Sequence, residues 1–530
     1  MSRPQRYLIL PARGLQATPD TASTAVHNFL TSLVSAGGAT ALRKKLNATV
    51  NASATAALGG AKKKLKAKAQ GVAVEAFELV ASLHENGVKL VSATPEMAAA
   101  MRYEQPGLRV VPEQFYRPAV FLAELRTRPA KPSTAAAAAL KRTLEIEVVR
   151  EDTGQAVRGA DVVAFTNYEA REGEGGRTKA NGKVSLTVPG SVKHYKRLYV
   201  QHELAGLWSY YAVNVNTKGT LRVILKKLDL AVGDSLRHFH DIGPDGSGQG
   251  VKVGIIDSGI ALNHPDLNVA GGLGCVPDEP EADFGPSGSH GTHVAGIIAG
   301  RGKEPTGVRG IAPAAELYSY RVFGTSESSG SNFALVKAIE RAVEDGCDLL
   351  NMSLGFDAPE GGVPQVDEAV QEAIRGAHKR GVLVIAAAGN DGRKPVNYPG
   401  FDDLVVAVSA VGRKGTFPAE SGEAGDVMPP YGADAKNFVA AFSNIGTELD
   451  VAGAGVGVVS TVPEGYAPMS GTSMACPAVT GVLARLLAAV PTILNAPRDS
   501  NRTDAIKKLL FDRAKTLGFK LELEGKGLPR

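Results

Sequence analysis

The chain has 530 residues, 44% of them hydrophobic, so it is too long for one ordinary domain and can bury several cores. Its net charge of +5 is small for this length and aromatics make up only 6%, which gives no reason to expect nucleic acid as a partner. Three cysteines, Cys275, Cys347 and Cys476, are too few and too scattered for a disulfide framework or a zinc site.

No apolar run is long enough to span a membrane, and the N-terminal apolar patch at 7–10 is far shorter than a signal-peptide core. We therefore expect a cytoplasmic protein with no membrane partner. Export by a route that needs no N-terminal signal stays open as the alternative.

Residues 1–120 predict a small α+β unit. Its pattern predicts strands at 7–10, 88–91 and 108–111 and helices at 77–83 and 95–101. An alanine-rich helical insert is predicted at 16–71. It carries lysine-rich runs at 43–45 and 62–68, which we interpret as a solvated helix face, with binding to an acidic surface as the alternative.

A linker and a β-rich module are predicted next. Residues 126–142 contain three prolines and five consecutive alanines, typical of a spacer, and the linker is placed at 121–143. Residues 144–228 contain about seven short apolar or alternating runs, with Asn181 and Gly182 as a hairpin signal. This pattern predicts a small β-sandwich, to which we assign no chemistry.

Residues 229–530 alternate strands with helices. The strands are predicted at 251–256, 316–322, 348–352, 383–387 and 404–409, and the helices between them include 333–344 and 366–380. This order predicts an α/β fold with a doubly wound parallel sheet, in which functional residues gather at the carboxyl ends of the strands. A segment at 414–441, rich in Gly, Glu and Pro, is predicted to be a surface loop.

Three segments of this region pair a reactive side chain with nearby glycines: VGIIDSG (253–259), HGTHVAG (290–296) and SGTSMACP (470–477). They supply a carboxylate at Asp257, a histidine base at His290 or His293, and a nucleophile at Ser473, and peptide hydrolysis needs such a base and nucleophile. Each residue alone has an ordinary interpretation, as a turn former, a zinc ligand together with His293, or a helix N-cap. All three together favour catalysis.

A fourth segment, AAAGN (386–390), adds the neutral amide of Asn390, a donor suited to an oxyanion. At these four segments the chain resembles the subtilisin-like serine peptidases. The resemblance implies a catalytic triad of Asp257, His290 and Ser473, and an oxyanion hole made by Asn390 and the backbone N–H of Ser473. It also implies a substrate-binding cleft lined by Ser353, Leu354, Gly355, Ala387, Ala388 and Gly389.

No cofactor and no metal is expected. The family's calcium loop would fall at 302–307, where one carboxylate stands beside a lysine, too few oxygens for Ca²⁺. Arg393 and Lys394 lie where the floor of the P1 pocket is expected, which leaves open an acidic P1 preference or two cations that point to solvent.

Residues 91–101 and 106–113 (VSATPEMAAAM and PGLRVVPE) resemble the second half of a subtilisin prodomain of the inhibitor-I9 type. That resemblance implies a zymogen whose own prodomain acts as intramolecular inhibitor and folding assistant, with proteins or peptides as substrates. Residues 157–160 and 178–182 (VRGA and TKANG) resemble carboxypeptidase-regulatory-like and Ig-like modules. Self-cleavage is expected within 116–142 or 228–248.

The sequence leaves two alternatives open. The chain is either a serine endopeptidase or a catalytically silent scaffold of the same fold that binds or regulates. If it is a peptidase, it either degrades proteins broadly or matures one defined partner.

Overall fold

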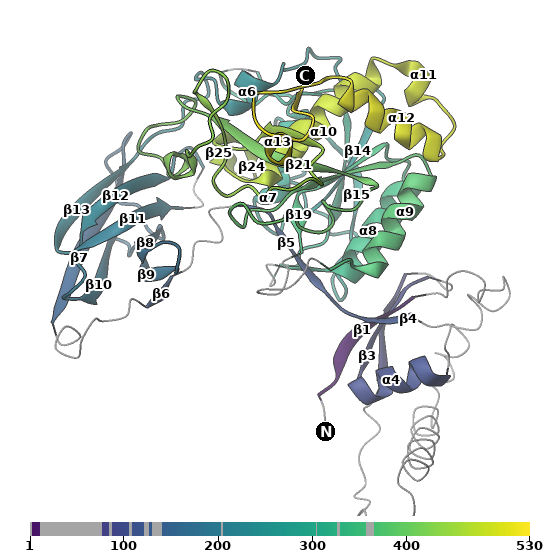
Figure 1. The fold of residues 1–530 in the computed structure, drawn as a ribbon, viewed down its shortest axis with the longest axis horizontal. Helices are drawn as coiled ribbons and strands as arrows, with labels where there is room; N and C mark the ends of the chain where they lie inside the picture. The colour runs from purple at the N-terminus through teal and green to yellow at the C-terminus, as the bar shows by residue number, and fades with distance from the viewer. Residues whose placement is uncertain are drawn as a thin grey trace, which may run out of the picture. The chain divides into compact units, whose positions relative to one another are not determined.

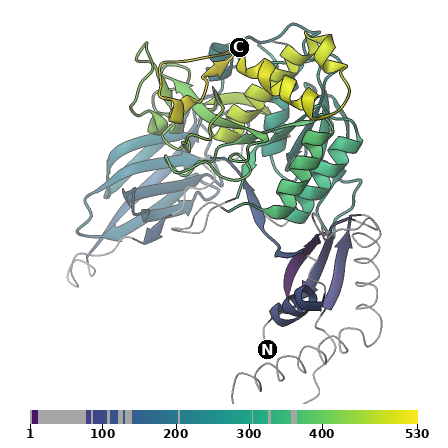
Figure 2. The same cartoon turned by 45° about the vertical axis from the view of Figure 1, so that its right-hand side comes forward.

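The computed structural model describes residues 3–10, 77–83, 87–104, 109–120, 127–129, 140–202, 205–303, 305–325, 329–356 and 365–530 (Figures 1 and 2). The predicted insert at 16–71, its lysine-rich runs and most of the linker at 121–143 lie outside these residues. The chain forms two compact units. The first holds residues 1–115 with Ser331–Lys337 and Asp367–Glu372, and the second holds the rest.

The first unit is built on a four-stranded antiparallel sheet in the order β2-β3-β1-β4. Its elements are β1 (Gln5–Leu10), β2 (Phe77–Ser82), β3 (Lys89–Ala93), α4 (Pro95–Glu104) and β4 (Arg109–Pro112). Met97, Ala98 and Met101 of α4 share one apolar core with Ile9 and Val91 of the sheet.

The helix predicted at 77–83 is wrong, because these residues form β2. β2 pairs with β3, with an irregularity in the register between Leu79 and Ala81. Periodicity cannot tell a short apolar run in a strand from one in a helix, and pairing with a neighbouring strand decides the outcome.

A β-sandwich follows within the second unit. One sheet has three strands (β10-β7-β13) and the other has five (β12-β11-β8-β9-β6). The strands are β6 (Arg128–Pro129), β7 (Lys141–Arg150), β8 (Asp161–Asn167), β9 (Glu172–Arg177), β10 (Lys183–Pro189), β11 (His194–Gln201), β12 (Tyr210–Asn216) and β13 (Gly219–Leu225). Their inward side chains, among them Ile146, Ala164, Leu186, Leu198 and Val223, form a separate core.

The prediction at Asn181 and Gly182 is right about the turn and wrong about the hairpin. The turn exists, and Gly182 adopts a positive φ of 71°. The strands on its two sides, β9 and β10, belong to different sheets, however, so the turn crosses the sandwich instead of closing a hairpin. β9 (EGEGGR) was missed because its glycines carry no strand signal.

The rest of the second unit is an α/β fold around an eight-stranded sheet. Its order is β15-β16-β14-β18-β20-β21-β22, with β23 also paired to β21, and all pairs are parallel except β21–β22. These strands are β14 (Lys252–Asp257), β15 (Val269–Gly274), β16 (Glu316–Arg321), β18 (Leu349–Met352), β20 (Leu383–Ala387), β21 (Val405–Arg413), β22 (Asn437–Val439) and β23 (Val451–Ala454). All five predicted strands are present.

Helices surround this sheet, and α8 and α9 run side by side (Figures 1 and 2). The helices are α6 (Ser235–Phe239), α7 (His290–Ala299), α8 (Asn332–Glu344), α9 (Glu368–Lys379), α10 (Thr472–Ala488), α11 (Pro491–Leu494), α12 (Ser500–Phe511) and α13 (Leu521–Glu524). The remaining short strands are β5 (Phe115–Pro118), β17 (Gly330–Ser331), β19 (Leu354–Gly355), β24 (Val458–Val462), β25 (Gly465–Met469), β26 (Ala514–Lys515) and β27 (Leu528–Pro529), of which only Phe115 and Ser331 are counted in the first unit. No helix in the described ranges is long and apolar enough to cross a membrane.

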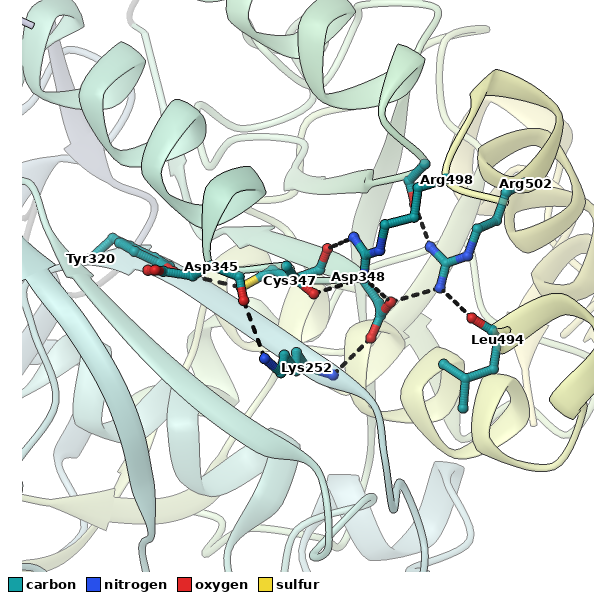
Figure 3. A network of polar contacts seen from close by, with 10 residues as sticks. Lys252, Tyr320, Asp345, Cys347, Asp348, Leu494, Arg498 and Arg502 are labelled. Carbon is teal, nitrogen blue, oxygen red and sulfur yellow. Dashed lines mark hydrogen bonds and ion pairs between the residues drawn. The ribbon is translucent and has the colours of Figure 1, made fainter. Parts of the chain in front are cut away.

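A buried ionic network joins the amino ends of the central strands to the C-terminal helices (Figure 3). Asp348 Oδ1 accepts hydrogen bonds from Arg498 and Arg502, each at 2.6 Å, while its Oδ2 accepts from the backbone N–H of Lys252 at 2.9 Å. Arg502 also donates to the carbonyl oxygen of Leu494 at 2.9 Å. The side chains of Asp348 and Arg502 are only 4% and 1% exposed, so each charge depends on the other.

The segment at 414–441, predicted as a surface loop, is partly buried. Its 3₁₀ helix η3 (Gly422–Asp426) buries Glu423 and Asp426. The segment contacts the β-sandwich, where the N–H of Gly422 donates to Ser209 Oγ (3.0 Å) and the N–H of Tyr211 donates to Glu420 O (2.7 Å). Composition alone could not show this contact, because the partner lies about 200 residues earlier in the chain.

Burial raises the pKa of Asp426 well above its ordinary value, and the neighbouring carboxyl of Glu423 raises it further, while Arg197 of β11 opposes the shift. Neither Asp426 oxygen has a hydrogen-bond partner within the described part of the chain. A carboxyl group with a raised pKa in the folded state holds its proton more tightly there than in the unfolded chain. Such a group therefore lowers the stability of the fold once the pH rises above the pKa that the group has in the unfolded chain.

Asp348→Ala should lower the free energy of unfolding by about 3 kcal/mol, because it leaves the buried Arg502 without its carboxylate. Chemical denaturation of the Ser473→Ala protein with and without the change measures this loss, since removal of Ser473 prevents self-digestion. Asp512→Ala is the matched control: it breaks an exposed pair with Lys508 and should cost less than about 0.5 kcal/mol. Equal losses for both variants would contradict the role given to the network.

Asp426→Asn, again with Ser473→Ala, should become progressively more stable than its parent as the pH rises from 4 towards 8. The physical reason is that the amide never has to ionise in its buried site. Asp434→Asn is the opposite control, because hydrogen bonds from Arg413 and from backbone N–H groups lower the pKa of Asp434. Its stability relative to the parent should fall as the pH rises from below 3 to above 4. Denaturation midpoints across this range test both slopes, and a flat difference for Asp426→Asn would refute the first.

Candidate active site

Asp257 and His290 meet at the carboxyl edge of the sheet. Asp257 is the last residue of β14, and His290 is the first residue of α7. His290 Nδ1 donates to Asp257 Oδ1 at 2.8 Å, and the same oxygen accepts the N–H of Ser258 at 2.6 Å. Since both side chains are buried, this bond keeps the proton on Nδ1 and leaves Nε2 as the basic nitrogen.

A glycine makes this approach possible. A Cβ at position 291 would overlap the carbonyl oxygen of Gly259, directly after the strand that ends in Asp257. The N–H of Gly291 also donates to Ser258 Oγ at 3.0 Å. The glycine of the HGTHVAG motif is therefore required by the packing of α7 against the end of β14.

Ser473 is the second residue of α10 and not its N-cap, a position that Gly471 takes. Its hydroxyl donates to the carbonyl oxygen of Ser353 at 2.8 Å. In the described part of the chain, His290 Nε2 has no hydrogen-bond partner. The structure thus joins Asp257 to His290, but Ser353 and not His290 holds the serine hydroxyl.

Asn390 lies three residues beyond β20. Its Oδ1 accepts both the N–H and the Oγ1 hydroxyl of Thr472, each at 2.9 Å. This pair of bonds orients the amide so that Nδ2 is a buried donor without a hydrogen-bond partner among the described residues. A second donor, the N–H of Ser473, belongs to the first turn of α10, where helical N–H groups have no partner within the helix.

A segment of the chain itself lies against this second donor. The N–H of Ser473 donates to the carbonyl oxygen of Ala119, and the N–H of Ala119 donates to that of Ser353, both at 3.2 Å. Arg117 and Pro118 of β5 pair antiparallel with Gly355 and Leu354 of β19, beside which β5 runs in Figure 1. Of the predicted substrate-binding residues, Ser353, Leu354 and Gly355 thus hold an extended peptide.

The other three predicted substrate-binding residues lie at the end of β20: Ala387 is its last residue, and Ala388 and Gly389 follow it. Their backbone groups are largely used inside the fold: the N–H of Ala388 donates to Val408 O (3.0 Å), and that of Gly389 donates to Thr472 Oγ1 (3.1 Å). The segment therefore positions Thr472 and Asn390, and its role in binding substrate stays a prediction.

The two cations near the expected P1 site behave differently. Arg393 donates to the carbonyl oxygen of Val439 at 2.7 Å and is half-buried, whereas Lys394 is exposed. Arg393 is thus held by β22 instead of pointing to solvent. The residue whose carbonyl group faces Ser473 is Ala119, which carries only a methyl group.

Asn351 is a site residue that sequence reasoning missed. Its Nδ2 donates to Ser353 Oγ (2.8 Å), its Oδ1 accepts from Thr480 Oγ1 (3.0 Å), and Ser353 Oγ in turn donates to the carbonyl oxygen of Ser473. This chain of bonds fixes the end of β18 against α10. The available signal was an asparagine within the otherwise apolar, buried strand β18.

His293 has a structural role. Its Nε2 donates to the carbonyl oxygens of Val458 (3.1 Å) and Ala467 (3.0 Å), which ties α7 to the β24–β25 hairpin. Complete burial lowers the pKa of His293 to about 3, so it stays neutral. Among the described residues no three His, Cys, Asp or Glu side chains come together as metal ligands. The loop at 302–307, where the family's calcium site would fall and where no metal is expected, includes Glu304, which lies outside the described residues.

Comparison with known proteins shows which family has this arrangement of residues. Residues 248–527 match the model of the subtilase family. The chain belongs to the subtilase family. It is 39% identical to Subtilisin DY of Bacillus licheniformis over 270 residues, which cover 50% of this chain and 86% of that protein. It is also 39% identical to Subtilisin Savinase of Lederbergia lenta over 239 residues, which cover 45% of this chain and 76% of that protein.

A third relative, M-protease of Shouchella clausii, is 40% identical over 239 residues, which cover 54% of its length. These matches identify a serine endopeptidase with a subtilisin-like α/β fold, as predicted from the four motifs. The β-sandwich and residues 1–115, the N-terminal unit, precede the residues that match the subtilase family model.

Asn390→Ala should lower kcat by about 10² to 10³ with little change in KM, because it removes a donor that acts on the negative charge of the tetrahedral intermediate. Steady-state hydrolysis of a peptide p-nitroanilide measures both constants. Asn501→Ala, at an exposed asparagine in α12, is the control and should leave both unchanged. An unchanged kcat for Asn390→Ala would show that Nδ2 does not act on the oxyanion.

Proposed function

We propose that this subtilase is made as a zymogen and hydrolyses peptide bonds of extended protein segments through Asp257, His290 and Ser473. The observation that carries the proposal is that residues 116–119 of the chain itself lie along β19 with a carbonyl oxygen on the N–H of Ser473. A peptide in this position excludes other substrates until it leaves.

The reaction follows from the geometry. Once its hydroxyl turns from Ser353 to His290 Nε2, Ser473 Oγ attacks the carbonyl carbon and His290 takes the proton. Asp257 keeps the imidazole in the correct tautomer and stabilises its charged form. The N–H of Ser473 and Asn390 Nδ2 bind the oxyanion. His290 then protonates the leaving amine, and water hydrolyses the acyl-enzyme.

Substrate recognition would rest on strand addition. Main-chain hydrogen bonds to Ser353 and β19 supply affinity for any extended peptide, and side-chain contacts supply preference. Tyr116, three residues before Ala119, is fully buried, with its ring 5.7 Å from that of Phe356. This contact supports a preference for a large aromatic residue at that substrate position.

The N-terminal unit is proposed to act as the inhibitor and folding assistant of the peptidase, as the prodomain resemblance implies. The support within the second unit is the placement of residues 116–119, which follow the N-terminal unit directly in the chain. A cytoplasmic location stays a prediction. All three cysteines are buried free thiols, as a reducing compartment would allow.

Wild-type protein should lose an N-terminal piece after purification, whereas Ser473→Ala should stay full length, because only the wild type has the nucleophile. Intact mass spectrometry of the two proteins checks this. A fluorophosphonate probe should label wild type and not Ser473→Ala. A wild type that is neither labelled nor able to hydrolyse casein would support the silent scaffold instead.

A further inference from the structure

The site already described holds one particular peptide bond of the chain, between Ala119 and Val120. The carbonyl oxygen of Ala119 accepts the N–H of Ser473 at 3.2 Å, so its carbon is the one presented to the nucleophile. The bond before it is fixed as well, because the N–H of Ala119 donates to Ser353 O, the same oxygen that holds Ser473 Oγ. Hydrogen bonds at both the N–H and the carbonyl oxygen of Ala119 thus fix which residue of the peptide lies opposite Ser473.

Two further observations point to the same carbonyl group. A Cβ at Gly471 would overlap the carbonyl oxygen of Ala119, so the absence of that Cβ opens the space the oxygen fills. Asn390 Nδ2 is a buried donor with no partner in the described part of the chain. It becomes the second oxyanion donor if the carbonyl carbon turns tetrahedral.

We infer that the enzyme cleaves its own chain between Ala119 and Val120, and that the β-sandwich stays in the mature enzyme, which then spans residues 120–530. The inference rests on the proposed function and names its first substrate sequence, Tyr-Arg-Pro-Ala followed by Val. The sequence led us to expect a cut within 116–142 or 228–248, and the inference selects one bond in the first of these regions.

Cleavage of this bond consumes only water. Ser473 Oγ bonds to the Ala119 carbonyl carbon while His290 Nε2 takes the hydroxyl proton. The C–N bond to Val120 breaks as His290 returns that proton to the Val120 nitrogen, which leaves as an amine. Water then attacks the ester through His290, which frees Ser473 and leaves Ala119 with a carboxylate.

Retention of the β-sandwich follows from its packing within the second unit. Trp208 is buried with Val308 and Val459, and the N–H of Gly206 donates to the carbonyl oxygen of Tyr466 at 2.8 Å. Phe165 and Tyr199 are part of the large apolar core of the peptidase fold. A cut at 228–248 would leave only these non-covalent contacts to hold the sandwich, whereas a cut after Ala119 leaves the sandwich covalently joined to the fold on which it packs.

The experiment follows processing of the full chain by intact mass spectrometry and N-terminal sequencing. Wild type should yield a product that begins with Val120 and contains the β-sandwich. Ala119→Asp should slow cleavage of this bond at least tenfold or so, because a carboxylate would enter a buried site that now holds a methyl group. Ala231→Asp, at an exposed residue of the other expected region, should process like wild type.

A readout in trans removes any doubt from misfolding of Ala119→Asp. Mature wild type is given acetyl-Tyr-Arg-Pro-Ala-p-nitroanilide or the same peptide with Asp in place of Ala. The Ala peptide should have a kcat/KM at least about tenfold higher. Equal values, a product that starts at another residue, or unimpaired cleavage of Ala119→Asp would each overturn the inference.

These failures are distinct from failure of the proposed function. A wild type that stays whole but hydrolyses casein and reacts with the fluorophosphonate overturns the Ala119–Val120 cut and leaves the peptidase in place. A wild type that does neither overturns both.

Discussion

The parallel pairing of β14, β18 and β20 is the constraint on which the functional groups depend. It brings the carboxyl ends of three strands to one edge, where they deliver Asp257, Ser353 and Asn390 from positions up to 133 residues apart. The helices α7 and α10 begin at the same edge and add His290 and Ser473. A change of register in any of these strands would move its functional group out of reach of the others.

Buried polar side chains also gather at this edge, and hydrogen bonds make their burial possible. Asn351 bonds to Ser353 and Thr480, and Thr472 donates to Asn390, so most of these side-chain donors have an acceptor. Among the described residues, His290 Nε2 and Asn390 Nδ2 are two buried nitrogens without a partner, and both act in the proposed reaction. At the opposite edge the network around Asp348 has a different task, since it ties α12 to the sheet by charges that are costly to leave unpaired (Figure 3).

The β-sandwich and the peptidase fold share buried surface, and this has a cost. Glu423 and Asp426 are carboxyl groups buried beside η3, and burial raises the pKa of both. The apolar contacts of Trp208 and Tyr199 offset that cost. The sandwich therefore packs as part of the peptidase unit, so the position of the proposed self-cleavage site decides whether a mature enzyme would keep it.

Much of the site was predictable because its residues stand in short strings whose glycines have a local cause. Gly291 and Gly471 are required by the close approach of the carbonyl oxygens of Gly259 and Ala119, so the motifs carry geometry as well as chemistry. The strands of the parallel sheet were also predictable, since fully buried strands read as continuous apolar runs. The N-terminal residues 77–82 were not, because a short apolar run fits a helix or a strand and only pairing with β3 decides.

The reaction class and the α/β architecture around Asp257, His290 and Ser473 follow from short local patterns in the sequence. The peptide that lies against Ser473 depends on tertiary contacts, since the pairing of Arg117 and Pro118 with β19 joins segments more than 230 residues apart. Tertiary contacts also decided the role of Asn351 and the burial of η3. Such contacts depend on where segments distant in the chain meet in space, which the local sequence pattern does not predict.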